Sequence, residues 1–251
     1  MRSASRFVPQ SPKVIRWIDH LVAVVEEFDA ARRVWLEAGC PVVWDGRIRG
    51  HRSCCFSIGP INLEMNAREV FEGWPALATW SDWTSRRFGL HAVAFDPGRL
   101  DAAVSQLRAA GLAMTEPREG ALTPSEDAPA ARPPRWRNSL AGGLPGLLPG
   151  LPSFLCEFVA PGPGQGRIAP ESPIRFVEIC VGVPEPAAAA ASYQRVLGVG
   201  PQTGPGGILI PLGDTPLRLV EGDDWFAVLK PRRPGLSLDD LAAAVPGLGW
   251  V

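Results

Sequence analysis

The sequence predicts an α+β protein built from tandem βαβββ modules. Three observations support this: a strand pattern occurs three times, each copy leads into a helical pattern, and short strand-like pieces follow. The strand patterns are WIDHLVAVV at Trp17–Val25, FGLHAVAFD at Phe88–Asp96 and RFVEICVGV at Arg175–Val183. Each is rich in apolar and β-branched residues, which is typical of a strand buried on both faces. Such internal similarity predicts repeated supersecondary units.

In each copy the helical pattern stops at a glycine. His20 precedes Gly39 by 19 residues, and the corresponding distances in the second and third copies are 20 residues. Glycine directly after a helix adopts the left-handed conformation without a steric penalty. Strand-like pieces follow in the first copy, with turns expected at Asp45-Gly46 and Gly59-Pro60. These pieces are Pro41–Trp44, Arg52–Ile58 and Ile61–Asn66.

The rest of the chain repeats the unit less completely. The stretch Glu119–Leu151 is rich in Pro, Gly and Leu, which predicts a long surface loop or a flap over a pocket. The third copy has strand-like pieces at Gly207–Leu212 and Leu217–Glu221, and a fourth copy starts at Trp225. We expect a disordered tail over residues 1–13, paired modules over 14–160, a linker over 161–173, and a third module with a truncated fourth over 174–251.

Composition excludes several classes of protein. The 251 residues are 46% hydrophobic with a net charge of −1, and they include nine Trp and ten Phe, so the chain as a whole is not disordered. The near balance of charges argues against nucleic-acid binding. The five cysteines have no CxxC spacing, which argues against a disulfide framework or a zinc knuckle. No apolar run is long enough to cross a membrane, and a reducing cytoplasm is the expected location.

Histidines and glutamates recur at matching places in the first two copies. Of the three histidines in the chain, His20 and His91 occupy the same position of aligned strands. The strands expected to close these two modules, INLEMNA and SFLCEFVA, place Glu64 and Glu157 in correspondence. A carboxylate inside an apolar strand is costly unless it is paired or bound to a metal ion. Imidazole and carboxylate ligands suit Zn, Fe(II), Ni, Co or Mn, so the pattern predicts a divalent metal site between the modules.

These motifs together resemble the vicinal oxygen chelate superfamily, also called the glyoxalase/bleomycin-resistance/extradiol dioxygenase superfamily. IDHLVAVV opens a module as family members do, and GRIRGHRSCCFSIGPINLEM, RWRN and SFLCEF are similar to its glyoxalase-like domain subgroup. The similarity covers roughly residues 14–223. The resemblance implies that the modules form a cupped mixed β-sheet, and it assigns the metal set to His20, Glu64, His91 and Glu157. In the third module Glu178 replaces the histidine, and Arg218 lies near the place of the closing glutamate.

The same resemblance implies an enzyme. The first expectation is a metal-dependent isomerase or lyase of the glyoxalase type, whose divalent ion holds vicinal oxygens of a small carbonyl substrate and stabilises an enediolate. Glu64 or Glu157 would then serve as the base. The second is a non-haem Fe(II) dioxygenase that uses His20, His91 and Glu157 on an aromatic diol. The third is a non-catalytic protein that binds a small molecule such as an antibiotic. Modules three and four would be structural or would form a homodimer surface.

Further residues are candidates for roles near the site. His51 begins a strand and could be an acid or base, although a surface position is the alternative. Arg135 and Arg137 share a strand face, and one of them could clamp a carboxylate or enolate. One of Cys54 and Cys55 should face the cup as an inert buried thiol. The tryptophans between the first two modules are expected to seal the seam between them or to line an aromatic pocket; they are Trp74, Trp80 and Trp83.

Overall fold

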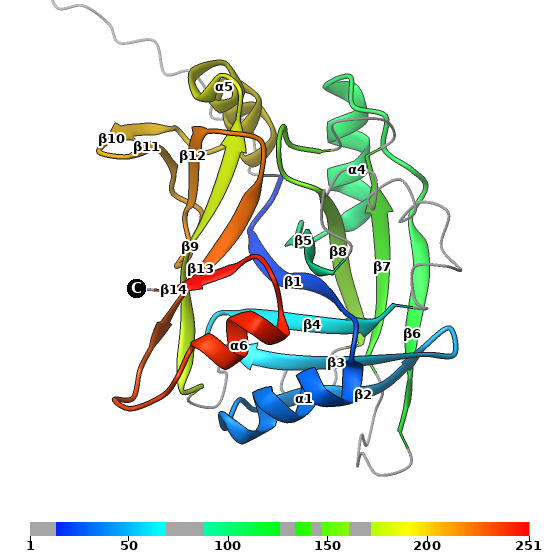
Figure 1. The fold of residues 1–251 in the computed structure, drawn as a ribbon. Helices are drawn as coiled ribbons and strands as arrows, with labels where there is room; N and C mark the ends of the chain where they lie inside the picture. The colour runs from blue at the N-terminus through cyan, green and yellow to red at the C-terminus, as the bar shows by residue number, and fades with distance from the viewer. Residues whose placement is uncertain (1–13, 69–87, 126–133, 142–146, 161–171, 251) are drawn as a thin grey trace, which may run out of the picture.

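The computed structural model describes residues 14–68, 88–125, 134–141, 147–160 and 172–250. The predicted tail, most of the predicted linker, and Trp74, Trp80 and Trp83 lie outside the described residues. Two β structures make up the described fold (Figure 1): a closed eight-stranded barrel and a separate six-stranded sheet. The predicted α+β fold of mixed, curved sheets built from βαβββ units is confirmed, and the first sheet closes completely.

The barrel contains the strands of the first two modules. Its order is β1-β4-β3-β2-β6-β7-β8-β5, so each module contributes one contiguous half. Within each half the first and last strands pair in parallel, β1 with β4 and β5 with β8, and antiparallel pairs β1/β5 and β2/β6 join the halves. The strands are β1 (Trp17–Val25), β2 (Val42–Ile48), β3 (His51–Ile58), β4 (Ile61–Ala67), β5 (Gly89–Asp96), β6 (Arg118–Pro124), β7 (Arg135–Leu140) and β8 (Ser153–Ala160).

Two helices lie against the outside of the barrel. Helix α1 (Phe28–Glu37) buries Phe28, Ala31 and Trp35, and helix α4 (Leu100–Ala109) buries a similar apolar stripe. Each ends just before a glycine with positive φ, Gly39 at 79° and Gly111 at 88°, as the sequence predicted. The apolar stripes pack on the outward faces of the strands, and the inward faces of the strands form a separate apolar cluster.

Two local predictions are wrong. The stretch expected to be a long loop, Glu119–Leu151, includes most of β6 and all of β7, because these strands complete the barrel wall between β2 and β8. Within it only Arg135–Arg137 was expected to lie on a strand, and β7 confirms that part. Strand β2 also runs through Asp45-Gly46, and the chain turns instead at Arg49-Gly50, where φ is 51° and 89°. Gly46 is needed within the strand, since a Cβ there would lie 2.3 Å from the Thr123 carbonyl oxygen.

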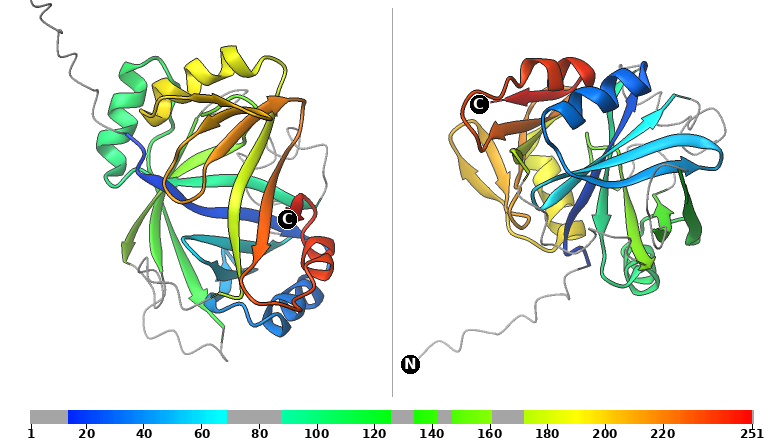
Figure 2. Two further views of the ribbon diagram at one scale, coloured as in Figure 1. Left: turned by 90° about the vertical axis from the view of Figure 1, so that its left-hand side faces the viewer. Right: turned by 90° about the horizontal axis from the view of Figure 1, so that it is seen from below.

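The third module and the start of a fourth form the six-stranded sheet, in the order β10-β11-β12-β9-β13-β14. Figure 2 (left) looks onto this sheet. Helix α6 lies beside α1, and the Leu90 amide donates to the Pro246 carbonyl oxygen at 2.8 Å, which ties this part to β5. No helix among the described residues is long and apolar enough to cross a membrane. The elements are β9 (Ile174–Val183), α5 (Pro186–Leu197), β10 (Gln202–Gly204), β11 (Gly207–Ile210), β12 (Leu217–Glu221), β13 (Trp225–Pro231), α6 (Asp239–Ala244) and β14 (Leu248–Trp250).

Candidate active site inside the barrel

Three ionisable side chains meet at the centre of the first module. His20 Nδ1 donates to Asp19 Oδ2 at 2.7 Å, and His20 Nε2 lies 3.3 Å from Glu64 Oε2. The imidazole is almost fully buried, with 3% of its side chain exposed, while the two carboxylates are slightly more accessible. Because Nδ1 is held by Asp19, the ring presents Nε2 to Glu64. The arrangement is a carboxylate–imidazole–carboxylate array, which is suited to proton transfer.

A β-bulge brings Asp19 to this array. The pairing of β1 with β5 skips from Ile18/Phe95 to His20/Ala94, so Asp19 is the extra residue. Neighbouring residues of a regular strand point to opposite faces, and the bulge breaks that alternation. Asp19 was not among the residues predicted from the sequence, because a regular strand would point its side chain away from that of His20. The only available signal was the position of an aspartate directly before a candidate histidine.

The pKa of His20 reflects two opposing influences. Burial disfavours the charged imidazolium, but the hydrogen bond to Asp19 and the charges of Asp19 and Glu64 favour it more. The outcome is a pKa above the ordinary value of 6.5. Glu64 is itself held in place, since Asn66 Nδ2 donates to Glu64 Oε1 at 2.9 Å. The site therefore pairs an imidazole that readily takes a proton with a fixed carboxylate.

The position of this pair recurs in the third module. In module one, Val22 lies two residues after His20 on β1, and the residue that pairs with Val22 on the closing strand β4 is Glu64. In module three Glu178 lies two residues before Cys180, whose partner on β12 is Arg218. Arg218 donates to Glu178 at 2.6 Å, which lowers the pKa of this carboxyl. The two pairs are geometrically alike, but Glu178 and Arg218 form an ion pair and cannot reproduce the chemistry of an imidazole.

In module two the same position is apolar. Ala94 is an inward residue like Val22, and its partner on β8 is Phe154. Phe154 therefore takes the place that Glu64 takes in β4, and its ring meets the edge of the His20 ring at a centroid distance of 5.9 Å. Ala92, two residues before Ala94, takes the place of His20. The barrel thus has one polar pair, His20 and Glu64, whereas the sequence also predicted a second pair of His91 and Glu157.

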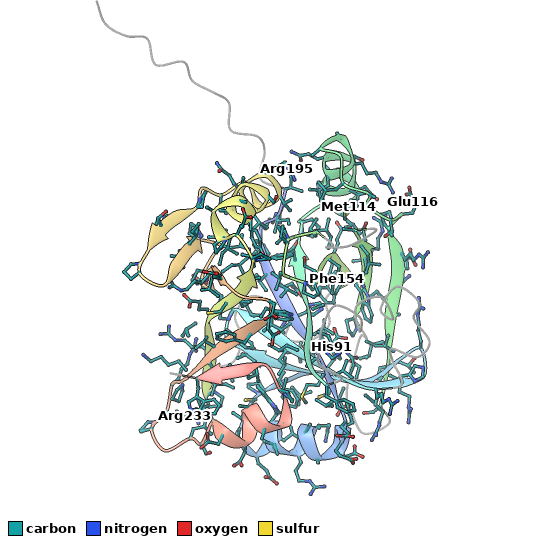
Figure 3. The ribbon with its side chains drawn as sticks, turned by 45° about the horizontal axis from the view of Figure 1, so that its top comes forward. His91, Met114, Glu116, Phe154, Arg195 and Arg233 are labelled. Carbon is teal, nitrogen blue, oxygen red and sulfur yellow. The ribbon has the colours of Figure 1, made fainter. Side chains whose placement is uncertain are left out.

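His91 is not beside His20. The pairing of β5 with β1 skips from Leu90/Ala23 to Ala92/Val22, which makes His91 the extra residue of a second bulge. Its Nδ1 donates to the Gly89 carbonyl oxygen at 2.9 Å (His91 and Phe154 are labelled in Figure 3). His20 pairs with Ala94, which lies three residues after His91 on β5. At the rise of a strand, the backbone of His91 is therefore displaced by about 10 Å along β5 from the residue that faces His20. The bulge, which the sequence does not reveal, displaces this histidine from the predicted set.

Glu157 lies on the outside of the barrel. Phe154 and Cys156 belong to the inward cluster and Phe158 packs against it, so Glu157 between the last two points outward. Its carboxylate accepts from the Leu100 amide at the start of α4 at 3.3 Å and lies 3.5 Å from Arg137. A free amide and the positive end of a helix dipole explain a carboxylate at this place without a metal ion. Alignment of the two module sequences places Glu157 opposite Glu64, but the strand register of the structure makes Phe154 the residue equivalent to Glu64.

The remaining candidates also lie away from His20. Arg135 has 61% of its side chain exposed and pairs with Glu119, and Arg137 forms two hydrogen bonds with Asp101 of α4. Both flank the inward Trp136, so they share the outward face, which does not suit a clamp on a substrate inside the barrel. His51 is on the inward-facing side of β3 by strand alternation, but it is the first residue of that strand. It lies four residues from Cys55, the residue that pairs with Glu64. That separation is about 13 Å.

The buried thiols near the site are inert. Cys55 and Cys156 face the barrel interior, whereas Cys54 faces outward. Burial, reinforced by the negative charge of Glu64, raises the pKa of Cys55 far above its ordinary value, and burial with the charge of Asp19 does the same for Cys156. Thiols that remain protonated are poor nucleophiles and poor metal ligands.

The residues do not fit the predicted metal set. Only His20 and Glu64 of the four predicted ligands converge, while His91 and Glu157 make other contacts. Across the described residues, no group of three or more His, Cys, Asp or Glu side chains is arranged to hold a metal ion. A resident catalytic ion such as zinc is usually held by three protein ligands. The interior of this barrel instead offers an acid–base pair.

Comparison with known proteins identifies relatives of the chain. The sequence model of the glyoxalase-like domain family matches residues 18–197. No curated protein matches the sequence. A hypothetical protein from Staphylococcus aureus has a similar structure, with a TM-score of 0.67 and 11% sequence identity over 87% of this chain and 92% of that one.

Two further structures share the fold at low identity. The Mn(II)-bound glyoxalase from Novosphingobium aromaticivorans has a TM-score of 0.53 and 14% identity over 91% of this chain and 68% of that one. A xylose isomerase-like TIM barrel/4-hydroxyphenylpyruvate dioxygenase fusion protein has a TM-score of 0.51 and 13% identity. This alignment covers 97% of the present chain but 41% of the fusion protein. At these identities the similarity concerns the fold.

Proposed function

The chain belongs to the glyoxalase-like domain family of the vicinal oxygen chelate superfamily, and from this membership we propose that it is an enzyme that moves a proton at a carbon next to a carbonyl group. The observation that carries the proposal is the 3.3 Å approach of His20 Nε2 to Glu64 Oε2, with Asp19 on the other ring nitrogen. A base and an acid so close together can act on adjacent atoms of one small substrate. The reaction class is isomerisation, or lyase chemistry where the substrate carries a leaving group.

Glu64 is the base in this mechanism and His20 is the acid. The Glu64 carboxylate takes the proton from the carbon, the electron pair of that bond forms a carbon–carbon double bond, and the carbonyl oxygen takes the proton from His20 Nε2. The product of this step is an enediol or enol. For a substrate with a hydroxyl group on the deprotonated carbon, Glu64 returns its proton to the former carbonyl carbon, and that hydroxyl group gives its own proton to His20. The new carbonyl group forms there, which completes an isomerisation. Asp19 stabilises the imidazolium that donates, and Asn66 holds Glu64.

Metal-dependent forms of this chemistry would need donors beyond His20 and Glu64. The contacts of Glu157 with Leu100 and Arg137 do not favour the four-ligand site of the glyoxalase type. The ferrous dioxygenase would need His20, His91 and Glu157 on one ion, whereas His91 binds the Gly89 carbonyl oxygen and Glu157 lies on the outer face of β8. We therefore assign the proton transfer to the side chains alone.

Solvent deuterium exchange tests the proposal directly. The protein is incubated in D₂O with α-keto aldehyde adducts, acyl thioesters and catechols, and deuterium incorporation is followed by NMR. Incorporation at the carbon next to the carbonyl group is expected for at least one of the first two classes. Glu64→Gln should slow exchange by about 10² or more, because it removes the general base. Val159→Ala, at a solvent-exposed position of β8, is the matched control and should exchange at the parent rate.

Other outcomes would replace this assignment. Oxygen-dependent cleavage of the catechol that needs added Fe(II) would establish the dioxygenase. Exchange that a chelator abolishes and Mn(II), Ni(II) or Zn(II) restores would establish the metal-dependent isomerase. Binding of these compounds without exchange under any of these conditions would establish a binding protein.

A further inference from the structure

The interior of the barrel has a polar half and an apolar half. Strands β1, β4 and β3 direct mainly polar side chains inward: His20, Glu64, Asn62, Asn66, Ser53 and Ser57. Strands β5, β6, β7 and β8 direct mainly apolar ones inward: Ala92, Ala94, Leu122, Trp136, Leu140, Phe154, Cys156 and Phe158. Trp44 of β2 joins the apolar half. This division follows the two modules, so a substrate between them contacts both kinds of surface.

Aromatic rings dominate the apolar half and reach the acid–base pair. The Phe158 ring lies 6.0 Å from the Trp44 ring, 6.2 Å from the Trp136 ring and 6.4 Å from the His20 ring, measured between centroids. Gly120 allows the Trp136 ring to pack directly against β6, because a Cβ there would lie 2.3 Å from the indole nitrogen. Tilted and edge-to-face rings of this kind favour a flat apolar or aromatic group beside them.

Unpartnered polar atoms concentrate in the same interior. Within the described part of the chain, seven buried side-chain polar atoms have no hydrogen-bond partner, and four of them lie in this interior: Ser53 Oγ, Ser57 Oγ, Asn66 Oδ1 and Trp44 Nε1. The other three belong to Trp35, Thr215 and Trp225. Ser53, Ser57 and Asn66 share the inward face with Cys55 and Glu64 through strand alternation. Buried polar groups are nearly always hydrogen-bonded, so several unpartnered ones on one inner surface indicate groups kept for a ligand. Hydroxyl groups and an indole N–H can donate to a carbonyl oxygen.

The charge of the interior is negative. Asp19 and Glu64 face one imidazole, so the array carries at least one net negative charge when both carboxylates are ionised. Among the described inward residues that are buried, none is Arg or Lys; Arg118 has the inward phase but lies exposed at the start of β6. The charged side chains that act on the buried Cys156 thiol are all carboxylates, namely Asp19, Glu64, Asp96 and Glu157. The arginines expected to clamp an anion, Arg135 and Arg137, face outward.

We propose that the site takes an uncharged carbonyl compound with an aromatic or similarly flat apolar group, and that it rejects substrates whose reacting end is a carboxylate or phosphate. This inference rests on the proposed function, since it specifies the substrate of the same site. The apolar group lies against Phe158, Trp136 and Trp44, and the carbonyl oxygen faces the polar half beside His20. An anion would meet the Glu64 carboxylate, and the positive charge of the His20 imidazolium is already balanced by Asp19.

Binding measurements separate this inference from the catalytic proposal. Isothermal titration calorimetry is carried out with α-hydroxyacetophenone, with phenylglyoxylate as an anion of similar size, and with hydroxyacetone as a neutral compound that lacks the ring. The aromatic ketone should bind about tenfold or more tightly than either of the others, because the anion is repelled and hydroxyacetone buries less apolar area. Phe158→Ala should weaken its binding by about tenfold. The adjacent variant Val159→Ala should leave it unchanged, since that side chain is exposed to solvent.

The Glu64→Gln variant tests the charge argument. Removing this negative charge should narrow the difference between the ketone and phenylglyoxylate several-fold. Equal or tighter binding of phenylglyoxylate by the parent protein would overturn the inference, as would binding of neither aromatic compound. Tight binding of the ketone without deuterium exchange would leave the inference standing and refute the proposed function. Deuterium exchange confined to anionic substrates would support the proposed function and refute the inference about the substrate.

Discussion

Replacing Asp19 with Asn should lower the pKa of His20 and shift the pH dependence of proton transfer. In the parent protein the Asp19 carboxylate accepts from Nδ1 at 2.7 Å, and its charge helps to outweigh the burial that opposes protonation. The asparagine keeps the size of the side chain and removes the charge. The buried ring then retains the penalty of burial but loses its main compensation. The pKa of His20 should therefore fall, because burial still opposes protonation and only the charge of Glu64 still favours it.

The size of the effect follows from the hydrogen bond. A hydrogen bond between charged partners is worth about 1.5–3 kcal/mol, and one pKa unit corresponds to about 1.4 kcal/mol, so a decrease of about 1–2 units is expected. Stability should change with a defined sign. Because folding raises the pKa of His20, its contribution is fully present below pH 6.5 and is lost as pH rises through the folded-state pKa. Asp19→Asn should therefore reduce the free energy of unfolding by about 1–3 kcal/mol at pH 6 and by less at pH 9.

Two measurements check this prediction. NMR titration of the imidazole resonances gives the pKa of His20, and the chain has only three histidines, so single substitutions assign them. The deuterium-exchange rate falls at high pH as His20 loses its proton, because a neutral His20 cannot donate. In the variant this fall should occur at a lower pH than in the parent protein. Asp45→Asn is the control, since Asp45 accepts from Arg32 at 2.7 Å on the outer face. An unchanged His20 pKa in Asp19→Asn, or an equal shift in Asp45→Asn, would refute the reasoning.

Three further predictions concern the barrel wall. Phe154→Glu should place a carboxylate opposite His20 and Glu64 at a cost of several kcal/mol, and Mn(II) should recover part of the lost melting temperature, whereas Phe154→Gln should show no such recovery. Glu157→Ala should cost about 1 kcal/mol in urea unfolding through the start of α4 and leave deuterium exchange unchanged; a large loss of exchange would return Glu157 to the active site. Gly89→Ala should destabilise the protein by about 2 kcal/mol or more, because its Cβ would lie 2.1 Å from the Pro246 carbonyl oxygen, while Gly111→Ala, which meets no atom within 4 Å, should cost less in the same denaturation assay.

Much of the barrel could be predicted because its signals are local. Apolar strand runs, helical stripes and glycines such as Gly39 and Gly111 act over a few residues, and each retains its meaning wherever the module is placed. The position of β6 was missed because its stretch is rich in Pro and Gly, and the strand is fixed by its neighbours β2 and β7. Pairing with distant strands overrode the local composition.

The active site divides in the same way. Local sequence was enough to select His20 and Glu64, because a histidine and a glutamate inside apolar strands need a partner. Which residues meet them depends on register and bulges, and a shift of one residue moves a side chain to the opposite face of a strand. That is why Asp19 joins the site, why His91 leaves it, and why Phe154 rather than Glu157 stands opposite His20. The sequence by itself determined the modules and selected His20 and Glu64. The closed barrel, through pairings between residues far apart in the chain, decided that the corresponding positions of the second module are apolar.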